Sequence, residues 1–150
     1  MKNKGKRCIG ASLLVVLVVG LIWWFYPMML LRRMSIANCR LVYQYHSVDE
    51  KGTITSIGYR DVEVSQMDTA AIVEELRKQD WTFREANDWN NHKLILTTSM
   101  GISFTVYIQS FDSDKLQLNG VGAWMSQESK ERFWHVIRKY ITDEYVASGP

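Results

Sequence analysis

The side chains of this chain with the best-known catalytic and metal-binding chemistry are three histidines and a few acids near them. His46 with Asp49 and Glu50 is the nearest local cluster of metal-ligand types, and a metal site needs at least three ligands at suitable spacing. This cluster falls at the tip of a predicted hairpin, which favours solvated turn residues. His135 stands beside an aromatic residue in a predicted helix, off its apolar stripe. We therefore predict no metal site.

Other reactive patterns are incomplete. Asp112 and Asp114 resemble the start of a calcium-binding loop, but the glycine and the distal glutamate of that loop are missing, which favours an ordinary β-turn. Cys39 with scattered histidines is the one combination suited to a thiol enzyme. It lies a few residues after a predicted membrane segment, where substrate access is poor. The chain has no Gly-x-Ser-x-Gly, His-Glu-x-x-His, Cys-x-x-Cys or phosphate-loop motif. We predict no catalytic residues, no cofactor and no enzymatic activity.

Aromatic residues are the more informative set. Trp89 lies in a polar segment, and Tyr107 is on the predicted outward face of a strand. Tryptophan and tyrosine are enriched where proteins bind partners, because they bury a large area at low entropic cost. Isolated surface aromatics are the plainer interpretation, since scattered exposed rings are common. Trp89 and Tyr107 are the candidate partner-binding residues.

A charge-free apolar run, residues 8–31, precedes all of these residues. A helix rises ~1.5 Å per residue and a bilayer core is ~30 Å thick, so the run predicts a single transmembrane signal-anchor helix that contacts lipid. Pro27 is expected to end or kink it, because proline lacks the helical N–H. One unbroken, tilted helix is the alternative. Aromatic rings and arginines settle at headgroup level, so the expected interface residues are Trp23, Trp24, Phe25, Tyr26, Arg32 and Arg33.

The flanking charges predict the orientation. The tail, residues 1–7, is basic without an acid, as expected of a cytoplasmic segment, and residues 32–38 form a juxtamembrane connection. The apolar run is longer than a cleavable signal peptide requires, so we expect a permanent anchor. A bacterial inner membrane, with the C-terminal domain in the periplasm, is the expected location. Residues 34–150 hold twelve basic and sixteen acidic side chains, a net charge of −4, which argues against nucleic acid as a partner.

Residues 39–150 are predicted to form one extracytoplasmic α+β domain. A mainly antiparallel sheet and two helices would make two layers in the order β-β-α-β-β-β-β-α. Asp68 is the expected N-cap of the first domain helix and Ser126 of the last. A phase slip at Gly58–Arg60 predicts a bulge or a bend. We expect residues 36–150 to fold alone. The expected strands are 39–48, 53–65, 81–86, 92–99, 102–110 and 115–124, with helices at 68–79 and 126–145.

These features together favour a membrane-anchored, non-enzymatic protein-binding module. A small, mildly acidic domain at the periplasmic face suits an immunity protein that captures a toxin, since complementary charge speeds capture of a basic partner. The alternatives are a bitopic accessory subunit of an envelope secretion or division complex, and an unrecognised envelope enzyme. The sequence does not identify a partner or an oligomeric state.

Overall fold

The computed structural model describes residues 4–51, 53–82 and 92–142 of the chain. A long helix comes first, a β-hairpin follows it, and a helix, a four-stranded meander and a final helix complete the described part. The elements are α1 (Lys4–Arg33), β1 (Ile36–Val48), β2 (Ile54–Val64), α2 (Gln66–Lys78), β3 (His92–Thr98), β4 (Ser103–Ile108), β5 (Lys115–Leu118), β6 (Val121–Trp124), α3 (Gln127–Ile137) and the 3-10 helix η1 (Arg138–Tyr140).

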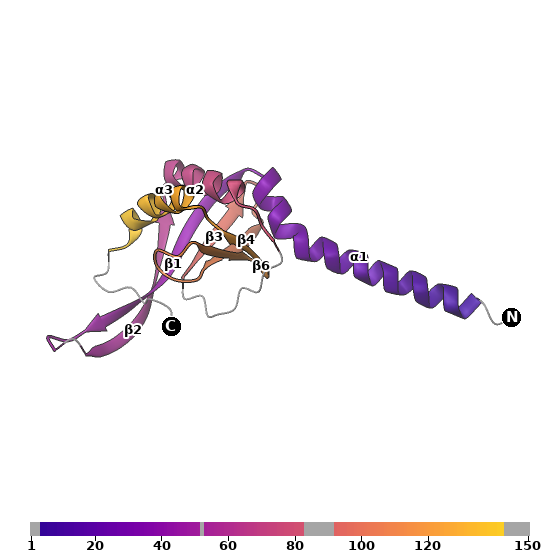
Figure 1. Ribbon diagram of the computed structural model, residues 1–150, viewed down its shortest axis with the longest axis horizontal. Coiled ribbons are helices and arrows are strands. Elements are labelled where there is room, and N and C mark those ends of the chain that lie inside the picture. The colour runs from indigo at the N-terminus through magenta and orange to yellow at the C-terminus, as the bar shows by residue number, and fades with distance from the viewer. Residues whose placement is uncertain (1–3, 52, 83–91, 143–150) are drawn as a thin grey trace.

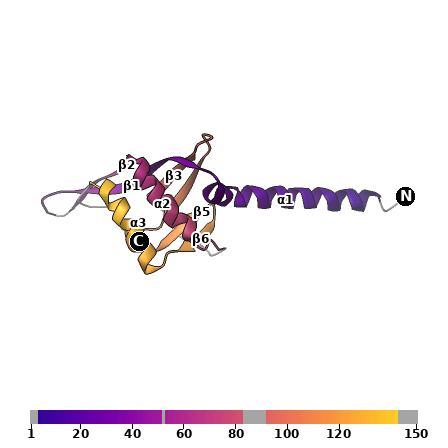
Figure 2. The same cartoon turned by 90° about the horizontal axis from the view of Figure 1, so that it is seen from above.

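The described strands form one antiparallel sheet in the order β2-β1-β3-β4-β5-β6. Helices α2 and α3 cover one face of this sheet, and α1 projects away from the domain (Figure 1). The β1–β2 hairpin extends from the opposite end of the domain, as the view from above also shows (Figure 2). The predicted α+β class with two layers and an antiparallel sheet is confirmed.

The core lies between the sheet and the two helices, because alternate strand residues point toward the helices. Phe104, Val106 and Ile108 of β4 are buried, as their alternation predicts. Their cross-strand neighbours are apolar too: Val106 lies between Leu94 of β3 and Leu118 of β5. Apolar side chains thus continue across the sheet from one strand to the next, and α2 and α3 cover them.

Two predicted strands differ from those observed. Residues 115–124 were expected to be one strand but form β5 and β6, because Asn119 and Gly120 both have positive φ (48° and 80°) and reverse the chain. Asn-Gly is the usual sequence of such a hairpin turn. The strand expected over 81–86 is reduced in the described part to one bridge between Thr82 and Gly122. Residues 83–91 lie outside the described part.

Two local predictions were wrong at the start of the domain. Ser65 rather than Asp68 is the N-cap of α2, and its hydroxyl accepts a hydrogen bond from the Asp68 N–H. The bulge expected at Gly58 is absent: the register of β1 and β2 shifts at Ser47/Val48 instead. Gly58 lies opposite Tyr45, and a Cβ at Gly58 would approach the Tyr45 ring to 2.5 Å, so the glycine makes room for that ring. Ser126 caps α3 as predicted.

Helix α1 is bent. Among the described residues no single helix is long and apolar enough to cross a membrane, but Ser12–Ile22 and Phe25–Arg33 meet at 43° and reach the required length and composition as a pair. The predicted transmembrane helix over residues 8–31 is therefore not supported in that form. Pro27 accounts for the bend, because its ring displaces the carbonyl one turn earlier and it has no N–H to donate.

The end of α1 is part of the domain. Leu30 and Leu31 are buried in the core (3% and 0% exposed), and Met34 packs against it. Arg77 of α2 donates two hydrogen bonds to backbone carbonyls there, from Nε to Leu31 O (2.8 Å) and from Nη2 to Met34 O (2.7 Å). Residues 32–38, expected to be a connection, therefore hold the end of α1 and the start of β1.

Candidate functional site

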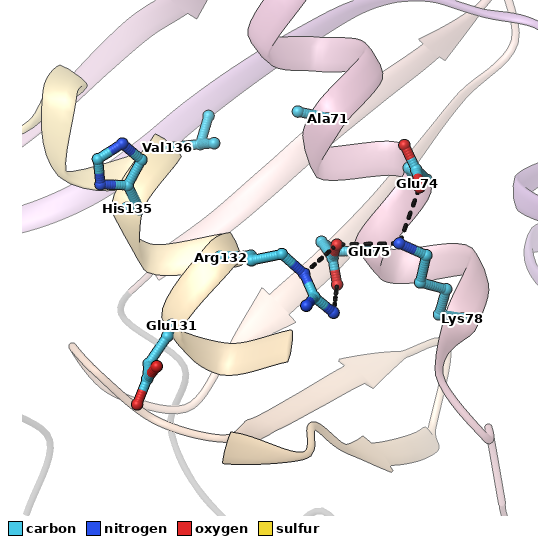
Figure 3. A pocket seen from close by; sticks show the side chains of 8 residues that line it. All are labelled: Ala71, Glu74, Glu75, Lys78, Glu131, Arg132, His135 and Val136. Atoms are coloured by element: carbon cyan, nitrogen blue, oxygen red, sulfur yellow. Dashed lines mark hydrogen bonds and ion pairs between the residues drawn. The ribbon is translucent and has the colours of Figure 1, made fainter. Parts of the chain in front are cut away.

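A cleft of about 710 Å³ lies between the two helices that cover the sheet. Figure 3 shows its charged side chains meeting across the cleft, with Glu75 and Lys78 on α2 and Arg132 on α3. Residues three apart on a helix share a face, which places Glu75 beside Lys78 on α2. Arg132 faces Glu75 from α3 (Figure 3). The lining residues are Ala71, Glu74, Glu75, Lys78, Glu131, Arg132, His135 and Val136.

Glu75 is the buried centre of this cluster, with a side chain that is 8% exposed. Its carboxylate accepts hydrogen bonds from Arg132 Nε (2.8 Å), Lys78 Nζ (3.1 Å) and the hydroxyl of Ser129 (2.7 Å). Gln79 Nε2 donates in turn to Ser129 Oγ (2.8 Å) and to the Glu75 carbonyl (2.6 Å). The cluster therefore joins α2 to α3 through charge-assisted hydrogen bonds.

The protonation of Glu75 decides what the cleft can do chemically. Burial favours the neutral acid, but the donors on Arg132, Ser129 and Lys78 outweigh it and lower the pKa of Glu75 to about 2. A general acid or base works best with a pKa near the operating pH. A carboxylate with so low a pKa is also a poor base for activating the Ser129 hydroxyl. This arrangement suits an ion pair that holds two helices together.

The predicted reactive residues lie on different elements. His46 is on β1, His92 begins β3, and His135 is on α3. His92 is buried, with its ring edge-on to that of Phe111 (5.4 Å between centroids), whereas His135 is exposed. Figure 3 draws His135 on the far side of Arg132 from Glu75. Within residues 4–51, 53–82 and 92–142, no three histidine, cysteine or acidic side chains are grouped to hold a metal ion. Cys39 is fully buried, and burial raises its pKa to about 12.

A second buried acid joins the start of α2 to η1, which follows α3. Asp68 accepts hydrogen bonds from Tyr140 Oη (2.6 Å), Lys139 Nζ (2.9 Å) and Ser65 Oγ (3.2 Å), and the first two lower its pKa most. Sequence reasoning missed both Asp68 and Glu75 as partners across the helices. For Glu75, the sequence feature that could have indicated its burial is its place between Ile72 and Leu76, two residues of the apolar stripe of α2.

Exposed apolar residues of the described part of the domain lie on β2 of the hairpin and also, singly, at Met67, Met100 and Trp124. Ile54, Ile57 and Tyr59 are 54%, 59% and 67% exposed, and among the described strands β2 has a neighbour on one side only. Tyr107 is half-buried on the face without helices, between Lys93 of β3 and Gln117 of β5. Trp89 lies outside the described residues.

The expected membrane-interface residues all lie on α1. Phe25, Arg32 and Arg33 are exposed, whereas Tyr26 packs against the domain core. The side chains of Trp23 and Trp24 lie outside the described part of the structure. No protein-family model matches the chain, and the comparisons found no curated protein and no solved structure that matches it.

Proposed function

We propose that the chain is a membrane-anchored, non-enzymatic protein-binding module, with α1 in the bilayer and the β1–β2 hairpin presented to a protein partner. One observation carries this proposal: exposed apolar residues occur on α1 and on β2 of the hairpin, and these two elements extend from opposite ends of the domain (Figure 1). The described apolar side chains of α1 from Leu13 to Ile22 are all exposed, between 45% and 72%. Apolar area in water costs about 25 cal/mol per Å², so lipid is the natural environment of this surface.

The proposed orientation places the N-terminus in the cytoplasm and the domain in the periplasm of a bacterial inner membrane. The basic tail, residues 1–7, supports it, because positively charged segments stay on the cytoplasmic side. The bend between Ile22 and Phe25 falls at the end of the charge-free stretch that would cross the bilayer, Cys8–Phe25, so it does not oppose insertion of that stretch.

The proposed partner is a basic protein that contacts the hairpin. Exposed Ile57 and Tyr59 stand on the outer face of β2, where an added strand or a flat apolar surface can pack against them. The net charge of −4 in residues 34–150 favours a basic partner through complementary charge. An immunity protein that captures a toxin in the periplasm is the specific form of this proposal.

Orientation is tested with a reporter fused after Pro150. A reporter that is active only in the periplasm should work, and the chain should float with membranes after alkaline washing. An active cytoplasmic reporter would reverse the orientation, and release by the wash would contradict the anchor.

Binding is tested by pull-down of the tagged full chain from solubilised membranes. Wild type should retain one soluble partner, and Ile57→Ser with Tyr59→Ser should lose it, since aromatic hot spots contribute about 2 kcal/mol or more. Met67→Ser is the matched control, because Met67 is also an exposed apolar residue (77%) but lies on α2. Equal retention by all three would exclude the hairpin. Co-purifying membrane subunits would instead favour an accessory role in an envelope complex.

A further inference from the structure

The second part of α1, Phe25–Arg33, is unable to enter the bilayer core while the domain stays folded. Leu30 and Leu31 are buried in the domain, and Arg77 holds the Leu31 carbonyl. The charge-free stretch left to cross the membrane is Cys8–Phe25, about 27 Å long at ~1.5 Å per residue. A hydrocarbon core is ~30 Å thick. The crossing stretch is thus no longer than the hydrocarbon core is thick, so the domain must lie directly at the membrane surface.

The exposed face of Phe25–Arg33 has the composition of an interfacial helix. Phe25 and Met29 are one turn apart and 37% and 49% exposed, and Arg32 and Arg33 follow on the next turn. No acid occurs in this segment. Apolar side chains beside cations, with the other face of the helix occupied, are typical of helices that lie in the headgroup region. An apolar hollow of about 340 Å³ at the bend is lined by Leu21, Ile22, Phe25, Tyr26 and Met29.

A second exposed methionine lies beside this segment. Met100 is 70% exposed in the turn between β3 and β4. The turn is joined to the end of α1 by a hydrogen bond from Ser99 N to Ser35 O (2.8 Å). Met100 is thus held at the same end of the domain as Arg33, where a membrane surface would meet both.

We propose that Phe25–Arg33 is an interfacial segment that seats the domain on an anionic phospholipid surface. Phe25 and Met29 lie among the upper acyl chains, Arg32 and Arg33 contact lipid phosphates, and Met100 makes a second contact with the same surface. This inference rests on the proposed membrane anchoring. It adds a fixed orientation, with the hairpin held away from the bilayer.

The test places an environment-sensitive fluorophore at single cysteines of the full chain in vesicles of phosphatidylcholine and phosphatidylglycerol. Cys8→Ser leaves Cys39 as the one native cysteine, and Cys39 is buried. The labelled variants are Met29→Cys, Met100→Cys and the control Met67→Cys, which is as exposed as Met100 but lies at the start of α2. Lipids brominated along their chains report depth, and aqueous iodide reports exposure to water.

The expected result is several-fold stronger quenching by brominated lipid at positions 29 and 100 than at position 67, with iodide showing the reverse order. Replacing Arg32 and Arg33 by glutamine should weaken lipid quenching at position 29, and replacing them by lysine should not. If the chain floats with the vesicles but position 29 is as open to iodide as position 67, the interfacial segment is refuted and the anchor stands. Absence of lipid quenching at position 29, together with a disulfide between two unlabelled Met29→Cys chains, would assign this face to a second copy. Failure to float would overturn the anchor and the segment together.

Discussion

Replacing Glu75 by glutamine should lower the free energy of unfolding by about 2–3 kcal/mol near neutral pH. The drop of its pKa from 4.5 to about 2 corresponds to roughly 3 kcal/mol at ~1.36 kcal/mol per pKa unit. Arg132 and Lys78 are 45% and 47% exposed, so solvent screening reduces this figure somewhat. Because the folded pKa is lowered, the stabilisation is complete above about pH 4.5 and is lost as pH falls toward about 2.

The assay is urea unfolding of the full chain in detergent micelles, followed by tryptophan fluorescence at about pH 7 and about pH 3. Less than half of the Glu75→Gln effect should remain at the lower pH, since the unfolded carboxyl is then mostly protonated. Glu74→Gln is the matched control, because Glu74 pairs with the same Lys78 (2.8 Å) but is 69% exposed, and it should cost under about 0.5 kcal/mol. An equal effect of the two substitutions, or an effect of Glu75→Gln that does not change with pH, would refute the assigned role.

Three further predictions concern buried residues. Leu31→Ala should cost about 2–5 kcal/mol in the same urea assay, because Leu31 is fully buried; a loss below about 1 kcal/mol would show that α1 does not complete the core. Phe104→Ala should cost about 3–5 kcal/mol, and near-neutrality would contradict the inward face of β4. Cys39 should resist iodoacetamide in the folded protein and react in urea, since burial raises its pKa to about 12; rapid alkylation of the folded chain at Cys39 would contradict this.

Strand faces were the most predictable part of the fold. The alternation in β1 and β4 places Leu41, Tyr43 and Phe104 toward the core, because a strand with one covered face must alternate. The Asn119–Gly120 turn could also have been predicted from its residue types, but the apolar residues around it led to the prediction of one continuous strand. Gly58 was misread because its role depends on Tyr45, which lies on the neighbouring strand and not beside it in sequence.

The candidate site was less predictable than the strands. A leucine that faces lipid and a leucine that faces a protein core look the same in sequence, so the burial of Leu30 and Leu31 was hidden within an apolar run. Residues 36–150 were expected to fold alone because their apolar stripes pair with one another, whereas the core of the structure extends back to Leu30. Two of the partners of Glu75, Ser129 and Arg132, come from α3, more than fifty positions later in the chain. Contacts between side chains of two helices follow from how the helices pack, and the local sequence around each residue does not predict them.

The direct passage from α1 into β1 has a mechanical consequence. Only Met34 and Ser35 separate the two elements, and no flexible loop lies between them. A force that a partner applies to the hairpin would therefore be transmitted along β1 and then along α1. The hydrogen bonds from β1 to β2 and β3 run perpendicular to the strand, so a force along β1 acts on them in shear, all together and not one after another. Tension applied between the hairpin and α1 would therefore pass along β1 without opening the sheet one hydrogen bond at a time.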